Sequence, residues 1–123
     1  MPMVGDTKTT TEYISKAELQ KKISFAKITD YVVEKAAVAI GAAIGGKVKG
    51  VLGAIGGALG SDLGKDALTT AIKSQSTTLK GYLKKVKDND AKGIKVTQTS
   101  RYSYMSGSGT AWHRSSNPKI TTY

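Results

Sequence analysis

Apolar and polar positions divide the chain into a long helical part and a shorter strand-like part. Residues 1–14 contain a run of threonines without apolar periodicity, and we expect a flexible N-terminal segment there, disordered or strand-like. Ser15 followed by Glu18 forms a capping box, which predicts that a helix begins at about Lys16. The helix is expected to continue to Gly45, because its later part is apolar nearly all round.

Glycine then recurs at helical spacing. Six glycines separated by 4, 3, 4, 3 and 4 residues would form one stripe along a helix: Gly46, Gly50, Gly53, Gly57, Gly60 and Gly64. An aliphatic stripe of the same rhythm lies about 180–200° round the helix. It consists of Val48, Leu52, Ile55 and Leu59. Each interior glycine costs roughly 1 kcal/mol relative to alanine, so the glycine stripe predicts close packing against another surface, within the chain or between chains.

Two lysines divide this apolar region. The 26 residues from Ala36 to Ser61 carry no charge except Lys47 and Lys49. As one helix they would span roughly 39 Å, more than a hydrocarbon core of about 30 Å. Each lysine near the middle would cost about 2.5–3.5 kcal/mol. We therefore expect either a glycine-zipper helical hairpin, folded at Gly45–Lys49, or several copies assembled so that the lysines face water.

A basic amphipathic helix is predicted next, with Ser61 and Asp62 available to cap it. Its apolar face consists of Leu68, Ile72, Leu79, Leu83 and Val86. The adjacent face carries Lys73, Lys80, Lys84 and Lys87. These lysines suit an anionic membrane surface; a solvated face and a nucleic-acid contact are the alternatives.

The C-terminal residues change to alternating, β-branched and aromatic composition. Strands are expected over 94–105, 110–114 and 119–123, separated by turn sequences. The predicted fold is therefore α+β, with a helical glycine-zipper region at 15–92 and a small antiparallel β-meander at 93–123. Eleven of the last 30 residues are serine or threonine, so at least one face of the sheet should be wet.

Aromatic residues concentrate in the same strands. Tyr102, Tyr104 and Trp112 fit either the core of a small sheet or an interfacial aromatic belt at a membrane. Because no RNA-binding motif accompanies them, a role in base stacking is the weaker interpretation.

Charge and composition define the class of partner. The net charge is +10, of which residues 47–123 carry +9, and this favours anionic partners such as lipid headgroups, teichoic acids or nucleic acid. Residues 1–20 are polar, so we expect secretion or release without a cleavable signal peptide and membrane association at the target. The chain has no cysteine, which excludes disulfides and thiol chemistry.

Catalytic and metal sites are not expected. His113 is the single histidine, and residues 94–123 contain no acid to complete a triad with Ser115 or Ser116. One histidine cannot form a zinc site by itself, and the glycines follow an apolar helical run and not a strand, unlike a phosphate loop. We predict that the protein is not an enzyme and uses no cofactor.

The segment AIGAAIGGKVKGVLGAIGGALG resembles the glycine zippers of small cationic pore-forming peptides, in particular class II bacteriocins and holin-like proteins. Its GxxxG pairs are Gly41/Gly45, Gly46/Gly50, Gly53/Gly57, Gly56/Gly60 and Gly60/Gly64. The resemblance covers about residues 41–64 and implies secretion against competing cells and membrane permeabilisation. The β-region has no counterpart in the simplest of these peptides.

Together these features predict a cationic, self-associating, membrane-active protein. Lysines would bind an anionic envelope, and the zipper would mediate oligomeric insertion. A structural subunit of a filament, tube or shell is the second interpretation, and a nucleic-acid-binding module is the third.

Overall fold

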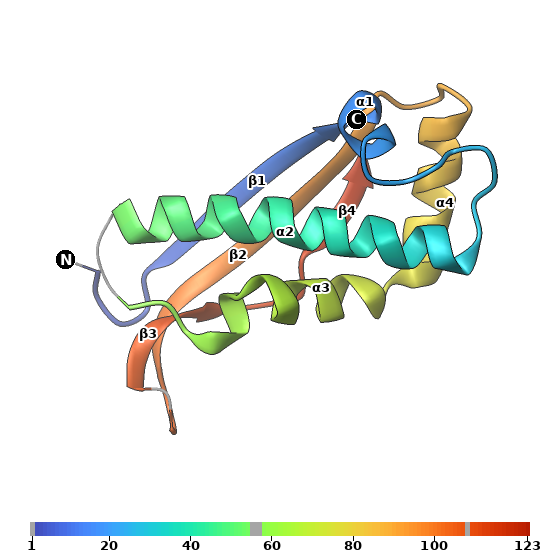
Figure 1. Ribbon diagram of the computed structural model, residues 1–123. Coiled ribbons are helices and arrows are strands. Elements are labelled where there is room, and N and C mark those ends of the chain that lie inside the picture. Colours follow the sequence, from blue (N-terminus) through green and yellow to red (C-terminus); the bar gives the residue numbers. More distant parts are fainter. Residues whose placement is uncertain (1, 55–57, 108) are drawn as a thin grey trace.

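The computed structural model describes residues 2–54, 58–107 and 109–123, and in them helices cover one face of an antiparallel sheet (Figure 1). The predicted α+β class is confirmed. In chain order the elements are β1 (Thr7–Ser15), α1 (Lys16–Gln20), α2 (Asp30–Ala54), the 3₁₀ turn η1 (Ser61–Leu63), α3 (Lys65–Lys73), α4 (Ser76–Lys87), β2 (Gly93–Met105), β3 (Gly109–Arg114) and β4 (Lys119–Thr122).

The long strand β2 is the centre of the sheet. β1 runs antiparallel along one side of it, from the Thr7–Arg101 pair to the Ser15–Gly93 pair. Both β3 and β4 pair with the other side of β2, one after the other. The predicted meander is therefore wrong in its last step, because β4 returns to β2 and does not pair with β3. The break falls at Ser115–Pro118, where proline has no N–H to continue a ladder.

The N-terminal segment is strand over most of its length. The expectation of a flexible segment at 1–14 is wrong for β1, which pairs with β2 along its whole length. Threonine favours extended backbone, and a partner strand almost 80 residues later supplies the hydrogen bonds. Such a partner cannot be recognised from local periodicity.

The helices also differ from the expected boundaries. The capping box at Ser15 is confirmed, because its Oγ accepts from the Glu18 backbone N–H at 3.2 Å, but α1 ends at Gln20. A new helix, α2, begins at Asp30, with the Thr29 hydroxyl accepting from the Val32 N–H at 3.3 Å. The expected basic helix is divided at residues 74–75 into α3 and α4.

The predicted helical hairpin is wrong, because α2 continues unbroken through Gly45–Lys49. Ile44 and Val48 are fully buried on its inner side, so tertiary packing outweighs the low helix propensity of the double glycine. Lys47 and Lys49 are exposed on the outer side, where water solvates them without a reversal of the chain.

The core lies between the helices and the inner face of the sheet. It is one continuous cluster to which α2, α3, α4 and β2 all contribute. Its largest fully buried side chains include Ile40, Ile44, Leu52, Leu68, Ile72, Leu79, Leu83 and Ile94. This arrangement decides which face of α2 is covered and which is open.

Candidate functional site

The predicted glycine stripe divides into an open part and a covered part. Gly46, Gly50 and Gly53 are exposed on α2, and a Cβ added at any of them would meet nothing within 4 Å. Gly60 and Gly64 have extended backbone on either side of η1, so a single helical stripe is wrong for these two. Gly57 lies outside the described residues.

Close helix contact is made by a different GxxxG pair. A Cβ added at Gly41 would lie 2.9 Å from the Thr69 Cα, and one at Gly45 would lie 3.3 Å from the Lys65 Cα. Both neighbours belong to the α3 helix. The glycines therefore allow α2 and α3 to approach each other within the chain, as small residues do at close helix interfaces.

The aliphatic stripe faces the protein. Val48 and Leu52 have no exposed surface, Leu59 is half-buried, and Ile55 lies outside the described residues. In this fold the sheet and neighbouring helices supply the apolar environment that the stripe requires. Lipid could reach Val48 and Leu52 only after α2 had separated from that core.

The opposite side of α2 is an uncovered, cationic surface of small residues. Ala42, Gly46 and Gly50 are exposed there beside Lys49. Lys47 lies 3.5 Å from Glu12 of β1. We call this surface the outer face of α2 and define it by Ala42, Gly46, Lys49, Gly50 and Gly53.

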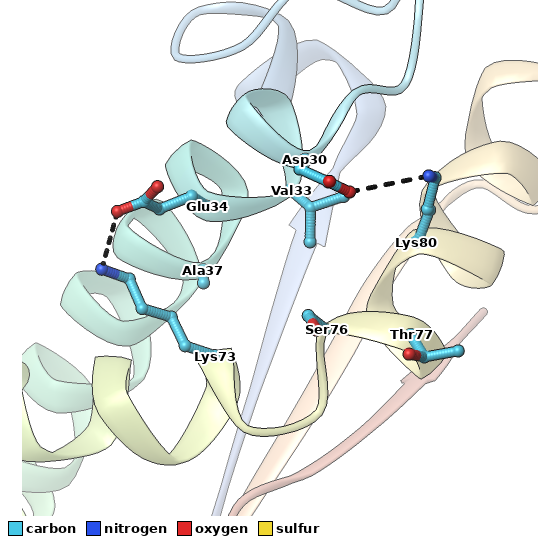
Figure 2. A pocket seen from close by; sticks show the side chains of 8 residues that line it. All are labelled: Asp30, Val33, Glu34, Ala37, Lys73, Ser76, Thr77 and Lys80. Carbon is cyan, nitrogen blue, oxygen red and sulfur yellow. Dashed lines mark hydrogen bonds and ion pairs between the residues drawn. The ribbon is translucent and has the colours of Figure 1, made fainter.

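Two of the four predicted surface lysines are already paired with acids of α2. Lys73 lies 3.1 Å from Glu34, and Lys80 lies 3.7 Å from Asp30 (Figure 2). The pairs flank a shallow hollow of about 430 Å³, lined also by Val33 and Ala37 of α2 and by Ser76 and Thr77 of α4. Because its charges are balanced, the hollow favours no ligand of one sign.

Lys84 and Lys87 are exposed on α4, where Lys85 lies beside them. The basic cluster of this helix is thus shorter than the sequence predicted. These three lysines remain available to an anionic surface.

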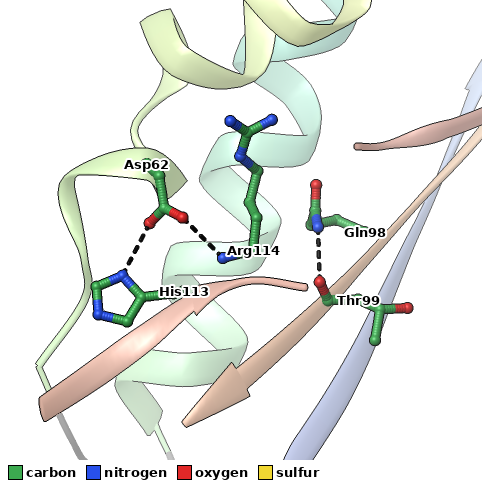
Figure 3. Close-up of polar contacts among 5 residues, drawn as sticks. All are labelled: Asp62, Gln98, Thr99, His113 and Arg114. Atoms are coloured by element: carbon green, nitrogen blue, oxygen red, sulfur yellow. Dashed lines mark hydrogen bonds and ion pairs between the residues drawn. The ribbon is translucent and has the colours of Figure 1, made fainter. Parts of the chain in front are cut away.

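His113 belongs to a buried contact that sequence reasoning did not find. Its Nδ1 lies 3.2 Å from Asp62 Oδ1, and Asp62 Oδ2 accepts the Arg114 backbone N–H at 2.9 Å (Figure 3). A Cβ at Gly60 would collide with the imidazole ring. The acid comes from η1, about fifty residues before the histidine, so no local pattern could identify it.

This contact ties the chain that follows α2 to the sheet. Beside it, the Trp112 N–H donates to the Ala58 carbonyl at 2.9 Å, and the Gly60 N–H donates to the Trp112 carbonyl at 2.8 Å. Neither Ser115 nor Ser116 is hydrogen-bonded to His113 in the part of the chain that the structure describes. The arrangement positions backbone and offers no nucleophile.

The aromatic residues lie in two environments. Trp112 is 2% exposed and meets Tyr102 edge-on, with ring centroids 5.4 Å apart. Tyr104 is 69% exposed near the end of β2. In this fold Trp112 is a core residue, and Tyr104 is the member of the predicted belt that could reach an interface.

Comparison with known proteins adds no relative. No protein-family model, no curated protein and no solved structure matches the chain. Function is therefore inferred from the surfaces described above.

Proposed function

We propose that the protein is a cationic, membrane-active protein of bacteriocin or toxin type, which binds anionic envelopes and inserts as an oligomer through α2. The observation that carries the proposal is the composition of α2. Among the described residues, Asp30–Gly53 is the one helical segment long and apolar enough to span a membrane, and 44% of its most apolar window is buried. Its 25 residues measure about 37 Å. A core helix of a water-soluble protein has the same properties, so the experiment must separate the two roles.

Insertion requires a second conformation. In the fold described, Val48 and Leu52 are covered by protein, and the outer face of α2 is open. A helix released into a bilayer would exchange protein contacts for lipid on its aliphatic side. Its glycines would then allow close contact with the same helix of another copy.

Lys47 and Lys49 oppose insertion of a single helix. Each would cost about 2.5–3.5 kcal/mol at the bilayer centre. Both are on the exposed side of α2 in the fold. An oligomer that directs them to a water-filled interior avoids this cost, which is why the proposal specifies several copies.

The charge of the molecule supports the first step. The net charge of +10 attracts the protein to anionic surfaces, where each lysine or arginine near the surface contributes about 1 kcal/mol. Lys84, Lys85 and Lys87 of α4 are exposed for such contact.

A reversible disulfide tests whether α2 must leave α3. A Cβ at Gly45 would lie 3.4 Å from the Lys65 Cβ, close to the usual 3.5–4.5 Å of disulfides. The chain has no cysteine, so Gly45→Cys with Lys65→Cys would form one defined crosslink. We expect the wild type to release dye from anionic liposomes at micromolar concentration. The oxidised double variant should release none, and reduction should restore release.

The two single variants, treated with the same oxidant, control for the substitutions themselves. Gly53→Leu should fold normally and leak less, because leucine on the outer face of α2 prevents close helix contact. No leakage by the wild type, or equal leakage by the oxidised crosslinked protein, would refute the proposal.

A further inference from the structure

The side of the sheet that faces away from α2 and α3 is a second uncovered surface (Figure 1). Along β2, Ile94, Val96, Gln98 and Ser100 are buried, so the intervening residues point outward. The register of β1 and β4 places their own outward residues beside these. The outer sheet face, as we define it, consists of Thr7, Thr9, Thr11, Tyr13, Lys95, Thr97, Thr99, Arg101, Lys119 and Thr121.

This face combines cations with hydroxyl groups and contains no acid. Lys95, Arg101 and Lys119 supply three positive charges, and none of the three forms an ion pair within the described ranges. Most of the remaining residues are threonines. Two cross-strand pairs bring threonine Oγ1 atoms together, Thr9 with Thr99 at 3.4 Å and Thr11 with Thr97 at 3.5 Å.

The spacing of these groups favours an extended polymer. Outward residues recur about every 7 Å along a strand, and neighbouring strands lie about 4.8 Å apart. The β2 row therefore reads lysine, threonine, threonine, arginine over a length of about 20 Å. A chain that alternates anionic groups with hydroxyl-bearing units could bind the cations at both ends and the hydroxyls between them.

Other anionic partners fit this face less well. Single-stranded nucleic acid needs aromatic ring faces for stacking, but the Lys95 ammonium lies over the Tyr13 ring at 5.8 Å, and the Tyr13 and Tyr123 rings already meet edge-on. A lipid surface would favour apolar side chains among the cations, and here the centre of the face is threonine.

We propose that the outer sheet face binds a phosphodiester-linked polyol polymer, the chemistry of an anionic cell-wall polymer. The assignment deepens the proposed function, on which it rests for its biological setting, by naming the envelope component that the protein meets first. It also moves the main anion contact from the helix lysines, two of which are paired with acids, to the sheet.

Two variants of equal charge test the assignment. Lys95→Gln, Arg101→Gln and Lys119→Gln change the sheet; Lys84→Gln, Lys85→Gln and Lys87→Gln change α4. Each set removes three positive charges from a net charge of +10, so a diffuse electrostatic effect would be the same for both. Purified poly(glycerol phosphate), free of lipid, is the probe in calorimetric titrations at low and higher salt. The sheet variant should bind at least ~10-fold more weakly than the wild type, and the α4 variant within ~3-fold of it.

A second pair of substitutions separates hydroxyl recognition from charge. Thr97→Val with Thr99→Val keeps side-chain size and charge but removes two hydroxyls, and should weaken polymer binding severalfold. An oligothymidylate and phosphatidylglycerol vesicles are the competing probes. The proposal is overturned if the two charge variants weaken polymer binding equally, or if either competing probe binds more tightly than the polymer and depends on the sheet residues.

The outcomes also separate this assignment from the proposed function. Vesicles without wall polymer test leakage alone, and the polymer without vesicles tests the sheet alone. A protein that binds the polymer through the sheet but never leaks would refute membrane activity and leave the sheet assignment standing. Leakage without polymer binding would do the reverse.

Discussion

At the scale of single residues, identical glycines have opposite roles because their surroundings differ. Gly41 faces the backbone of Thr69 across the α2–α3 interface, and Gly60 faces the His113 ring. Gly46 and Gly50 face open space on the same helix as Gly41. Spacing alone grouped the exposed glycines with buried ones, since periodicity gives the side of a helix and says nothing of what covers it.

Substitution by alanine should therefore change stability in opposite directions at two sites of α2. Gly50→Ala is expected to raise the free energy of unfolding by about 0.5–1 kcal/mol, because alanine is the better helix former and meets nothing. Gly41→Ala should lower it by about 1–3 kcal/mol, because the methyl group would overlap Thr69. Urea denaturation of both variants measures the difference. Changes of the same sign would show that the two glycines do not face different surroundings.

At the scale of elements, the sequence identified most segments and misjudged their limits and partners. The capping box at Ser15, the strand from Gly93 and the composition of β3 were sufficient to predict the start of α1 and the C-terminal strands. The continuity of α2 was not predictable, because Gly45 and Gly46 lower helix propensity while the core that stabilises them comes from distant residues. For the same reason β1 was missed.

The inner face of α2 gives a second test. Leu52→Ala should lower the free energy of unfolding by about 2–5 kcal/mol, because it leaves a cavity in a fully buried position. Val38→Ala is the control on the same helix, since Val38 is 49% exposed, and its effect should stay within about 0.5 kcal/mol. Thermal or urea unfolding in lipid-free buffer measures both. An equally small effect of Leu52→Ala would mean that the aliphatic stripe is not part of the folded core.

At the scale of the whole molecule, the layers leave two opposite surfaces uncovered. The outer face of α2 is small and cationic, and the outer sheet face is cationic and rich in hydroxyls. The core is continuous between them, so the folded form needs no second copy to bury its aliphatic residues. Self-association in the proposed function therefore belongs to the inserted state.

We accordingly expect a monomer in buffer and an oligomer on anionic vesicles. Sedimentation velocity without lipid should give a single species of about 13 kDa, and chemical crosslinking after flotation with phosphatidylglycerol vesicles should give higher species. Neutral phosphatidylcholine vesicles are the control and should not retain the protein, because the +10 charge then has no counterpart. Filaments or large particles formed without lipid would instead support a structural subunit.

The sequence by itself determined the α+β class, the cationic character and the presence of one helix suited by composition to a membrane. Those properties depend on composition and short-range periodicity, which are local. The tertiary structure decided that Val48 and Leu52 face protein, that Gly46 and Gly50 face solvent, and that lysines and threonines from three strands share one surface. These facts depend on contacts between residues far apart in the chain, chiefly the pairing of β1 with β2 and the packing of α2 on α3, which no local pattern records.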